Sequence, residues 1–366
     1  MTHIRNFTPG PVEVSSEVLA AQDGPQRLHV GPEFAQAYMR ATENLQKVFG
    51  TSGHVAIVPG CGTLANEMAI RAMLDVGQTA LILDAGYFST ILKWAVEGCG
   101  AKAVMMPVPE GKPADPEAVR AALAEQKIDL LCFTHVETST TLLQPIEALA
   151  KVAQEAGVPV MVDSVSALGT CLSRVDDWGI AVMTSCSQKG LESIPGLGLV
   201  AVAENAWPRI EAKTSPRGGV TDLLRWRNQV EVARDWHPSV TTMPVAAVHA
   251  LDIAVGKALS EGLDARYDRH STARDFLCDA MEGLGFDLLI DAGSRAAGVT
   301  GVKTGGRFNS SELVAYLVEN HGLRIAGGFG TNREEVFRVA HMGDHASISA
   351  LRPVLAGLES FLATQS

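Results

Sequence analysis

The 366-residue sequence predicts an α/β protein with a mostly parallel sheet, and three observations support this. Apolar runs of strand length alternate with segments of helical periodicity from residue 54 to residue 203, the order that places helices on both faces of a parallel sheet. The run at 158–162 is followed by a single acid, and the run at 180–183 is followed by small polar residues and then one lysine. Towards the C-terminus strands become neighbours in sequence, which favours a smaller α+β domain.

The individual elements follow from periodicity and from glycine and proline. Apolar positions repeat with helical spacing from Pro32 to Phe49, and Gly50 follows as a helix-terminating residue. Pro116 stands at a first-turn position of another helix. Helices are expected at 32–49, 64–74, 90–98, 115–126, 145–157, 241–258 (beginning after Pro244), 261–283, 310–319 and 348–362. Strands are expected at 54–58, 80–83, 102–108, 129–136, 158–162, 180–183, 199–203, 286–290, 298–302, 323–326 and 336–340. The pattern loosens between 207 and 236, a polar region expected to lie between subunits.

Composition argues against several classes of protein. No apolar run approaches the roughly 20 residues of a membrane helix, and a net charge of −11 without a basic cluster disfavours nucleic acid and anionic membranes as partners. The six cysteines are scattered singly without a Cys-x-x-Cys pair, which argues against a disulfide framework and a zinc site. The first residues lack the pattern of a secretory signal. A cytoplasmic protein without membrane or nucleic acid partners is therefore expected.

The stretch from Met161 to Gly190 carries the main chemical signal. Asp163 ends one apolar run and Lys189 follows the next, so parallel strands would bring an acid and an amine to the same sheet edge, where open α/β sheets bind ligands. Pyridoxal phosphate is held by a lysine Schiff base, and a carboxylate keeps its pyridine nitrogen protonated. Lys189 and Asp163 are candidates for these roles. The alternative is a turn-capping acid and a surface lysine.

A glycine-rich turn follows the strand expected at 54–58. Gly60-Cys61-Gly62-Thr63 opens a helix whose free amides can hold a phosphate. The same segment also fits a loose dinucleotide fingerprint, Gly60-x-Gly62-x-x-Ala65 with Asp84 downstream, which keeps a nicotinamide-dependent dehydrogenase open.

Further candidates follow other strand ends. Tyr87 and Phe88 are expected in a loop after the strand at 80–83, where a ring can stack on a planar cofactor or simply pack in the core. The hydroxyls between His135 and Thr140 can bond a phenolic oxygen or cap the turn. His135 and Glu137 have no third ligand at suitable spacing, so no metal site is expected.

Two residues outside these segments are candidates for substrate binding. Arg338 lies in the apolar strand at 336–340, where its charge needs a planar anion such as a substrate carboxylate, or a partner such as Glu334 or Glu335. Gly10 lies in the Thr8–Pro11 turn and either lets the backbone approach a ligand or only redirects the chain.

Nine short motifs in chain order resemble the class V, fold type I aminotransferases. The resemblance is nearest to alanine–glyoxylate and serine–glyoxylate aminotransferases and to 2-aminoethylphosphonate–pyruvate transaminase. The motifs are TPGP (8–11), GPEF (31–34), GCGTLANE (60–67), AGYFS (85–89), HVETST (135–140), VDSVSALG (162–169), SQKG with PGLG (187–190 and 195–198), TTMPV (241–245) and FRVAHMG (337–343).

The resemblance implies a fold, a reaction and an assembly. The fold is a large pyridoxal 5'-phosphate-binding domain at 21–260 with a mostly parallel seven-stranded sheet between helices, an N-terminal arm at 1–20, and a small C-terminal α+β domain at 261–366. The reaction is a transamination from a small donor of the alanine, serine or 2-aminoethylphosphonate type to a small 2-oxo acid, pyruvate or glyoxylate. The assembly is a homodimer with active sites at its interface.

The resemblance also implies a role for each candidate. Lys189 forms the Schiff base and moves the proton, and Asp163 binds the pyridine nitrogen. Phe88 and Val165 enclose the cofactor ring. Substrate binding falls to Arg338, as the carboxylate clamp, and to Gly10. The remaining cofactor contacts are Cys61, Gly62, Thr63 and Gln188 at the phosphate, Thr138 at the phenolic oxygen, and Thr242 at the phosphate of the neighbouring subunit.

Some positions depart from the family pattern. Cys61 stands where serine is common, Ser239 where alanine–glyoxylate enzymes have an interface tyrosine, and Thr141 where glycine is usual. The segment 215–226 is closer to the aminoethylphosphonate branch. A lyase of the cysteine desulfurase type remains an alternative, although Gln188 replaces its histidine before the lysine and the last cysteine, Cys278, lies on an expected helix.

Overall fold

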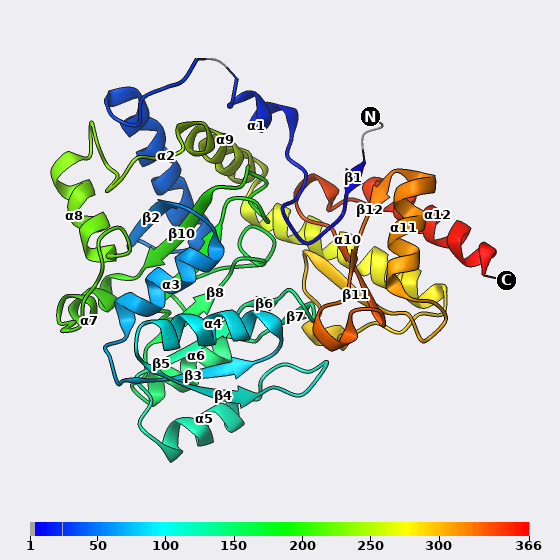
Figure 1. Cartoon of the computed structure of the whole chain (residues 1–366), viewed down its shortest axis with the longest axis horizontal. Helices are drawn as coiled ribbons and strands as arrows, with labels where there is room; N and C mark the ends of the chain where they lie inside the picture. The colour runs from blue at the N-terminus through cyan, green and yellow to red at the C-terminus, as the bar shows by residue number, and fades with distance from the viewer. Residues whose placement is uncertain (1–3, 24, 366) are drawn as a thin grey trace.

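The structure is a computed structural model that describes residues 4–23 and 25–365. It has a larger and a smaller body, and a seven-stranded sheet forms the centre of the larger one (Figure 1). Six strands run in one direction, and β10 runs against both of its neighbours. The predicted mostly parallel, seven-stranded sheet is therefore confirmed. In spatial order the strands are β2 (His54–Pro59), β10 (Leu197–Val202), β9 (Val182–Cys186), β8 (Val160–Asp163), β5 (Leu130–Thr134), β3 (Thr79–Asp84) and β4 (Lys102–Pro107).

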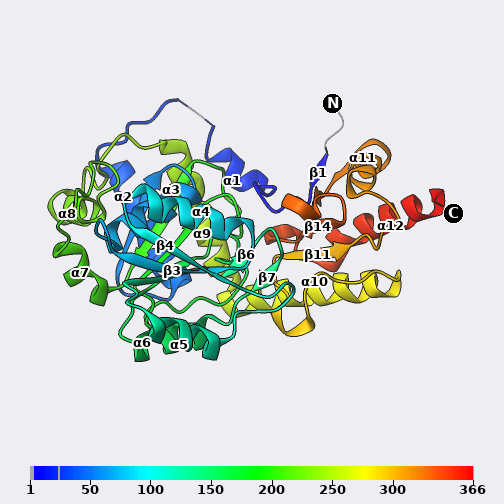
Figure 2. The same ribbon diagram turned by 60° about the horizontal axis from the view of Figure 1, so that its bottom comes forward.

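Helices cover both faces of this sheet. Figure 2 shows α3 (Gly62–Met73) and α4 (Tyr87–Gly98) on one side and α5 (Pro116–Glu125) and α6 (Ile146–Glu155) on the other. All residues of β5, β9 and β10 are buried, as expected for strands covered on both faces. α2 (Pro32–Phe49) packs along α9 (Val245–Glu261) and against β2. The weaker pattern at 207–236 contains two helices, α7 (Trp207–Glu211) and α8 (Leu223–Ala233).

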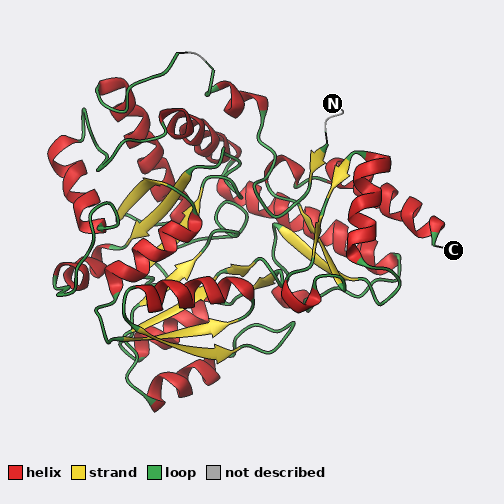
Figure 3. Cartoon of the chain, viewed as in Figure 1, coloured by secondary structure: helices red, strands yellow, loops and turns green. Residues whose placement is uncertain are grey.

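The smaller body has its own hydrophobic core and a separate group of strands, visible in Figure 3. Its three-stranded sheet has the order β11 (Val299–Lys303), β14 (Val336–Ala340), β13 (Ala326–Gly327). α10 (Leu263–Gly283), α11 (Ser310–His321) and α12 (Ile348–Thr364) pack around it. The two bodies agree with the predicted large and small parts, while the boundaries at 20 and 260 stay predictions.

Two predicted strands of the smaller body are wrong in extent. The segment 286–290 is no strand: it makes one isolated bridge, Leu288 to Val302, because the chain then turns into a short 3-10 helix at Ala292–Ser294. The segment 323–326 divides into β12 (Leu323–Arg324) and β13, which pair with different partners. Within the described residues, no helix has both the length and the apolar character needed to cross a membrane.

The N-terminal arm connects the two bodies. Its first strand, β1 (Arg5–Asn6), pairs with β12, and the Ala340 amide donates to the Phe7 carbonyl. Further on, the Val12 amide donates to the Gln188 carbonyl, 3.1 Å away. α1 (Ser16–Ala20) then packs against α9. The arm therefore crosses from the small body to the segment that carries Lys189 (Figure 1).

Candidate active site

The structure brings Asp163 and Lys189 to the same edge of the sheet. Asp163 is the last residue of β8, and Lys189 lies three residues beyond β9, which pairs with β8 in parallel. The negative charge of Asp163 and the positive charge of Arg338 both act on the Lys189 amine. An acid, an amine and a guanidinium therefore share one site.

Asp163 is a buried carboxylate, only 5% exposed. Its Oδ2 accepts a hydrogen bond of 2.7 Å from Asn66 Nδ2, and its Oδ1 accepts one of 2.9 Å from the Val165 amide. Thr184 in turn donates to the Asn66 amide oxygen, which fixes the direction of that side chain. Burial raises the pKa of Asp163. A carboxylate held this way fits a cationic N–H partner such as a pyridinium, which would compensate for its burial.

Lys189 lies under the N-terminal arm. Its Nζ donates to the Pro9 carbonyl. Gly10 adopts φ +122°, and a Cβ added there would lie 2.5 to 2.6 Å from Lys189 Cδ, Cε and Nζ, so only glycine fits against this side chain. Burial, together with the Arg338 charge, lowers the pKa of Lys189. A lowered pKa makes the neutral, nucleophilic amine more available.

The turn before α3 is suited to a phosphate. The side chain of the N-cap residue, Cys61, makes no capping hydrogen bond in this 12-residue helix, so among the described residues the first amides keep their hydrogen-bonding capacity. Cys61 and Thr63 are exposed there. A Cβ at Gly62 would lie 2.5 Å from Val165 Cγ2, which places Val165 directly against the turn. Gln188, on the neighbouring loop, is half-buried.

Tyr87 and Phe88 form the first turn of α4, so the predicted loop at this position is wrong. The helix begins earlier than residue 90 because side chains from a distant segment cap it. The Tyr87 amide donates to Ser139 Oγ over 2.9 Å, and the Phe88 amide donates to Glu137 Oε1 over 3.3 Å. These partners lie some 50 residues away in sequence, and local periodicity does not reveal them.

The His135–Thr140 segment contributes backbone and hydroxyl groups. Thr138 Oγ1 hydrogen-bonds Ser166 Oγ, and the Thr138 carbonyl accepts from Arg338 Nη1 over 2.8 Å. Thr141 has φ +64°, a left-handed conformation that favours glycine and is rare for a β-branched residue. Thr141, which stands where glycine is usual in the family, is therefore a strained position.

Glu137 is fully buried beside these groups. Its Oε1 accepts from the Ser139 amide and hydroxyl as well as from Phe88, while Oε2 has no hydrogen-bond partner among the described residues. Burial raises the pKa of Glu137 to about 7. In sequence, Glu137 stands out only as a candidate metal ligand beside His135. Its place among hydroxyls after a strand is the signal that points to a helix cap.

Arg338 is held with its guanidinium at the domain interface. It is 5% exposed and donates to two carbonyls, Gly327 over 3.0 Å and Thr138 over 2.8 Å. Phe329 lies over it, with the guanidinium carbon 5.2 Å from the ring centroid. Burial lowers the pKa of Arg338 to about 10. The acid whose charge acts on it is Glu137, and the predicted alternative partner Glu334 bonds the Ser311 amide instead.

Three further positions named from the sequence lie outside this cluster of contacts. Ser239 is buried, and its hydroxyl donates to the Thr241 carbonyl. Thr242 is exposed shortly before α9. Cys278 is buried on α10 in the smaller body. The proposed contact of Thr242 with a second subunit stays a prediction.

The fold and the site together define a pyridoxal phosphate-dependent aminotransferase of fold type I. The chain belongs to the class V aminotransferases, because the family model described as Aminotransferase class-V matches residues 17–342. It is 30% identical to an uncharacterized aminotransferase of Methanocaldococcus jannaschii, over 92% of this chain and 86% of the relative. It is 28% identical to alanine–glyoxylate aminotransferase of Rattus norvegicus, over 93% and 83%.

A solved structure from Nostoc sp., an alanine–glyoxylate aminotransferase, superposes with a TM-score of 0.94 at 27% identity, covering 99% of this chain and 96% of the other. Ureidoglycine–glyoxylate aminotransferase from Bacillus subtilis gives 0.94 at 25% identity, covering 100% and 94%. The predicted family, fold class and cofactor-dependent transamination are confirmed. The desulfurase and dehydrogenase alternatives are not favoured.

Proposed function

We propose that this aminotransferase takes its amino group from a small donor of the alanine, serine or 2-aminoethylphosphonate type and transfers it to glyoxylate or pyruvate. The observation that carries the proposal is that the charges of Asp163 and Arg338 both act on the Lys189 amine. Relatives named for glyoxylate, at 27 to 28% identity, support this choice of acceptor. The cytoplasmic location stays a prediction from the sequence.

We assign the cofactor contacts to residues that fit them by geometry. Asp163 would hold the pyridine nitrogen protonated, since its buried carboxylate needs a cationic partner. Phe88 and Val165 would enclose the ring, and Thr138 would face the phenolic oxygen. The phosphate would lie at the open N-terminus of α3, on Cys61, Gly62 and Thr63, with Gln188 beside them. When bound, pyridoxal phosphate supplies an electron sink for the α-carbon of the donor.

The protein's own groups would bind the substrate and move the proton. Arg338 would orient the carboxylate of donor and acceptor through its planar guanidinium. Burial lowers the pKa of Lys189, so its Nζ would take the α-proton from the donor. The same Nζ would return a proton to complete the transfer of the amino group. Gly10 and the arm above Lys189 would keep water from this amine.

We also propose a homodimer in which Thr242 reaches the phosphate of the neighbouring subunit. Large apolar side chains are exposed near α8 and before α2, among them Leu28 at 74% and Val232 at 77%, which favours a partner on this side. The test mixes subunits that carry Lys189→Ala with subunits that carry Thr242→Trp. Recovery of activity on mixing would support shared sites. Full activity of Thr242→Trp on its own, or a monomeric wild-type protein with full activity, would contradict the proposal.

The test of the reaction combines attachment and turnover. Borohydride reduction of the cofactor-loaded protein should link the cofactor to the peptide that contains Lys189, and Lys189→Ala should lose both this link and transamination. Lys213→Ala is the matched control, because Lys213 is another buried lysine and donates to Leu74, away from the site. A screen of amino donors against glyoxylate and pyruvate then identifies the pair. Retained activity in Lys189→Ala would overturn the assignment.

A further inference from the structure

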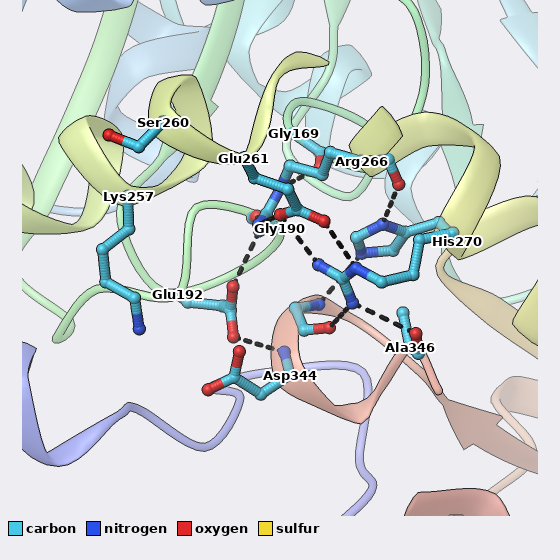
Figure 4. A network of polar contacts seen from close by, with 12 residues as sticks. Gly169, Gly190, Glu192, Lys257, Ser260, Glu261, Arg266, His270, Asp344 and Ala346 are labelled. Atoms are coloured by element: carbon cyan, nitrogen blue, oxygen red, sulfur yellow. Dashed lines mark hydrogen bonds and ion pairs between the residues drawn. The ribbon is translucent and has the colours of Figure 1, made fainter. Parts of the chain in front are cut away.

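Three segments that carry proposed active-site residues meet at the start of α10. The turn after Asp163 reaches Gly169, the turn after Lys189 runs through Gly190 to Glu192, and the segment after Arg338 reaches Gly343 and Asp344. Figure 4 shows the polar side chains of α10 among these turns. We call Glu192, Glu261, Arg266, Arg269 and His270 the α10 network.

Arg266 binds two of the three segments at once. Its Nε donates to the Gly169 carbonyl over 2.9 Å, and its Nη2 donates to the Gly190 carbonyl over 2.8 Å. The two turns touch, since a Cβ at Gly169 would lie 2.7 Å from the Gly190 carbonyl oxygen. Arg266 is 3% exposed, so these bonds form away from water. The guanidinium therefore sets the distance between the turn that follows the acid and the turn that follows the amine.

Glu192 and His270 connect the turns after Asp163 and Lys189 to the third segment, which follows Arg338. Glu192 Oε2 bonds Arg266 Nη2 at 2.7 Å, and its Oε1 accepts from the Asp344 amide at 2.5 Å. Glu192 has φ +54°, an uncommon conformation for glutamate that the surrounding bonds maintain. His270 accepts from the Gly343 amide at 3.0 Å and bonds the Arg266 carbonyl at 2.8 Å. Gly343 lies five residues beyond Arg338.

Two groups of the network, Glu261 and His270, have pKa values well below neutral pH. Bonds from Arg269 and Arg266 lower the pKa of Glu261 to about 2, and burial lowers that of His270 to about 3. The other charged groups that face Arg266 are Glu192 and Glu261, both bonded to it.

We propose that Arg266 is a positioning residue that holds Lys189 at a fixed place relative to Asp163 and, through Glu192 and His270, relative to the strand of Arg338. The inference rests on the proposed function, because it concerns the residues assigned to that site. The Lys189 side chain would have to move in the proposed reaction, so its backbone needs a fixed anchor. Arg266 supplies this anchor from the small body.

Arg266→Lys tests the proposal, since it keeps the charge and loses the planar fork that reaches both carbonyls. Arg269→Lys is the matched control: Arg269 lies one turn along α10 and also bonds Glu261, but its other partners are the carbonyls of Gly343 and Ala346. Two readouts apply. One is the rate at which trinitrobenzenesulfonate modifies Lys189 in cofactor-free protein, located by peptide mass. The other is the pH midpoint of the visible absorbance of the loaded protein.

Arg266→Lys should raise the modification rate at Lys189 about fivefold and shift the absorbance midpoint, with kcat down about tenfold because a shift of an ångström misaligns a reacting group. Arg269→Lys should leave both readouts at the wild-type value. If Arg266→Lys does not fold, Glu192→Gln replaces it, which keeps the side-chain shape and removes the ion pair. Unchanged Lys189 reactivity in the folded variant overturns the proposal. Failure of wild-type protein to attach the cofactor at Lys189 would instead overturn the proposed function, and the modification rates would still be compared.

Discussion

Replacing Gly10 with alanine should displace Lys189 without unfolding the protein. Alanine at φ +122° is strained by roughly 1 to 3 kcal/mol. Its Cβ would also lie 2.5 Å from Lys189 Cδ, and ordinary contact needs about 3.5 to 4 Å between carbons, so the side chain must move by about an ångström. The end of a lysine is flexible, and this movement adds little to the strain energy. It does separate the amine from the Pro9 carbonyl.

Gly77→Ala is the control for the first effect, because it has the backbone strain without the clash. Gly77 has φ +81°, and a Cβ there would meet no atom within 4 Å, so this variant has strain alone. Both variants should lose similar stability in a thermal unfolding experiment on cofactor-free protein. Only Gly10→Ala should slow attachment of pyridoxal phosphate, followed by visible absorbance, by roughly 10- to 100-fold, since misplacement by about 1 Å costs that much in reactions between positioned groups.

Two results would refute this reasoning. Equal rates of cofactor attachment in Gly10→Ala and Gly77→Ala would mean that Gly10 does not confine Lys189. A much larger loss of stability in Gly10→Ala than in Gly77→Ala would mean that the clash is absorbed by the arm and the fold rather than by the lysine.

Three other changes have defined outcomes. Burial raises the pKa of Glu137 from 4.5 to about 7, so the folded state binds this proton more tightly than the unfolded state does. The free energy of unfolding should therefore fall by about 3 kcal/mol as pH rises from about 4.5 through 7. Glu137→Gln should lack this fall when unfolding is measured in urea, and an unchanged pH slope in the variant would contradict the reasoning. Arg338→Gln should raise KM for the 2-oxo acid by roughly 30- to 100-fold, the loss of about 2 to 3 kcal/mol of charged hydrogen bonds, with a smaller effect on kcat; an unchanged KM would point to another clamp. Phe329→Ala removes the ring over Arg338 and should raise the same KM about threefold to fivefold, while Trp94→Ala, on the exposed side of α4, should leave it unchanged.

The sequence predicted correctly those helices whose first and last residues are set by neighbours in the same stretch of chain. α2 was expected and found at Pro32–Phe49, because Pro32 starts the helix and Gly50, with φ +66°, ends it within the same stretch. The start of α4 was missed since its caps come from Glu137 and Ser139. The strand at 286–290 was over-predicted because apolar content alone does not show where a chain leaves its neighbour.

In the candidate site too, some residues were predictable from the sequence and others were not. Lys189 and Asp163 could be placed because strand ends in a parallel sheet meet at one edge. The groups that orient them could not: Asn66 lies on an ordinary amphipathic helix, and Arg266 resembles any charged residue of α10 in sequence. Their importance comes from contacts across about 75 to 100 positions. A single sequence carries no periodic signal for such contacts.

The pairing of β1 with β12 joins Arg5 to Leu323. During synthesis β1 leaves the ribosome more than 300 residues before its partner strand β12, so it stays without this partner while the large body is made. The large body can fold in that interval with Lys189 uncovered. Covering of the Lys189 amine by the arm is therefore one of the last steps in folding of this chain.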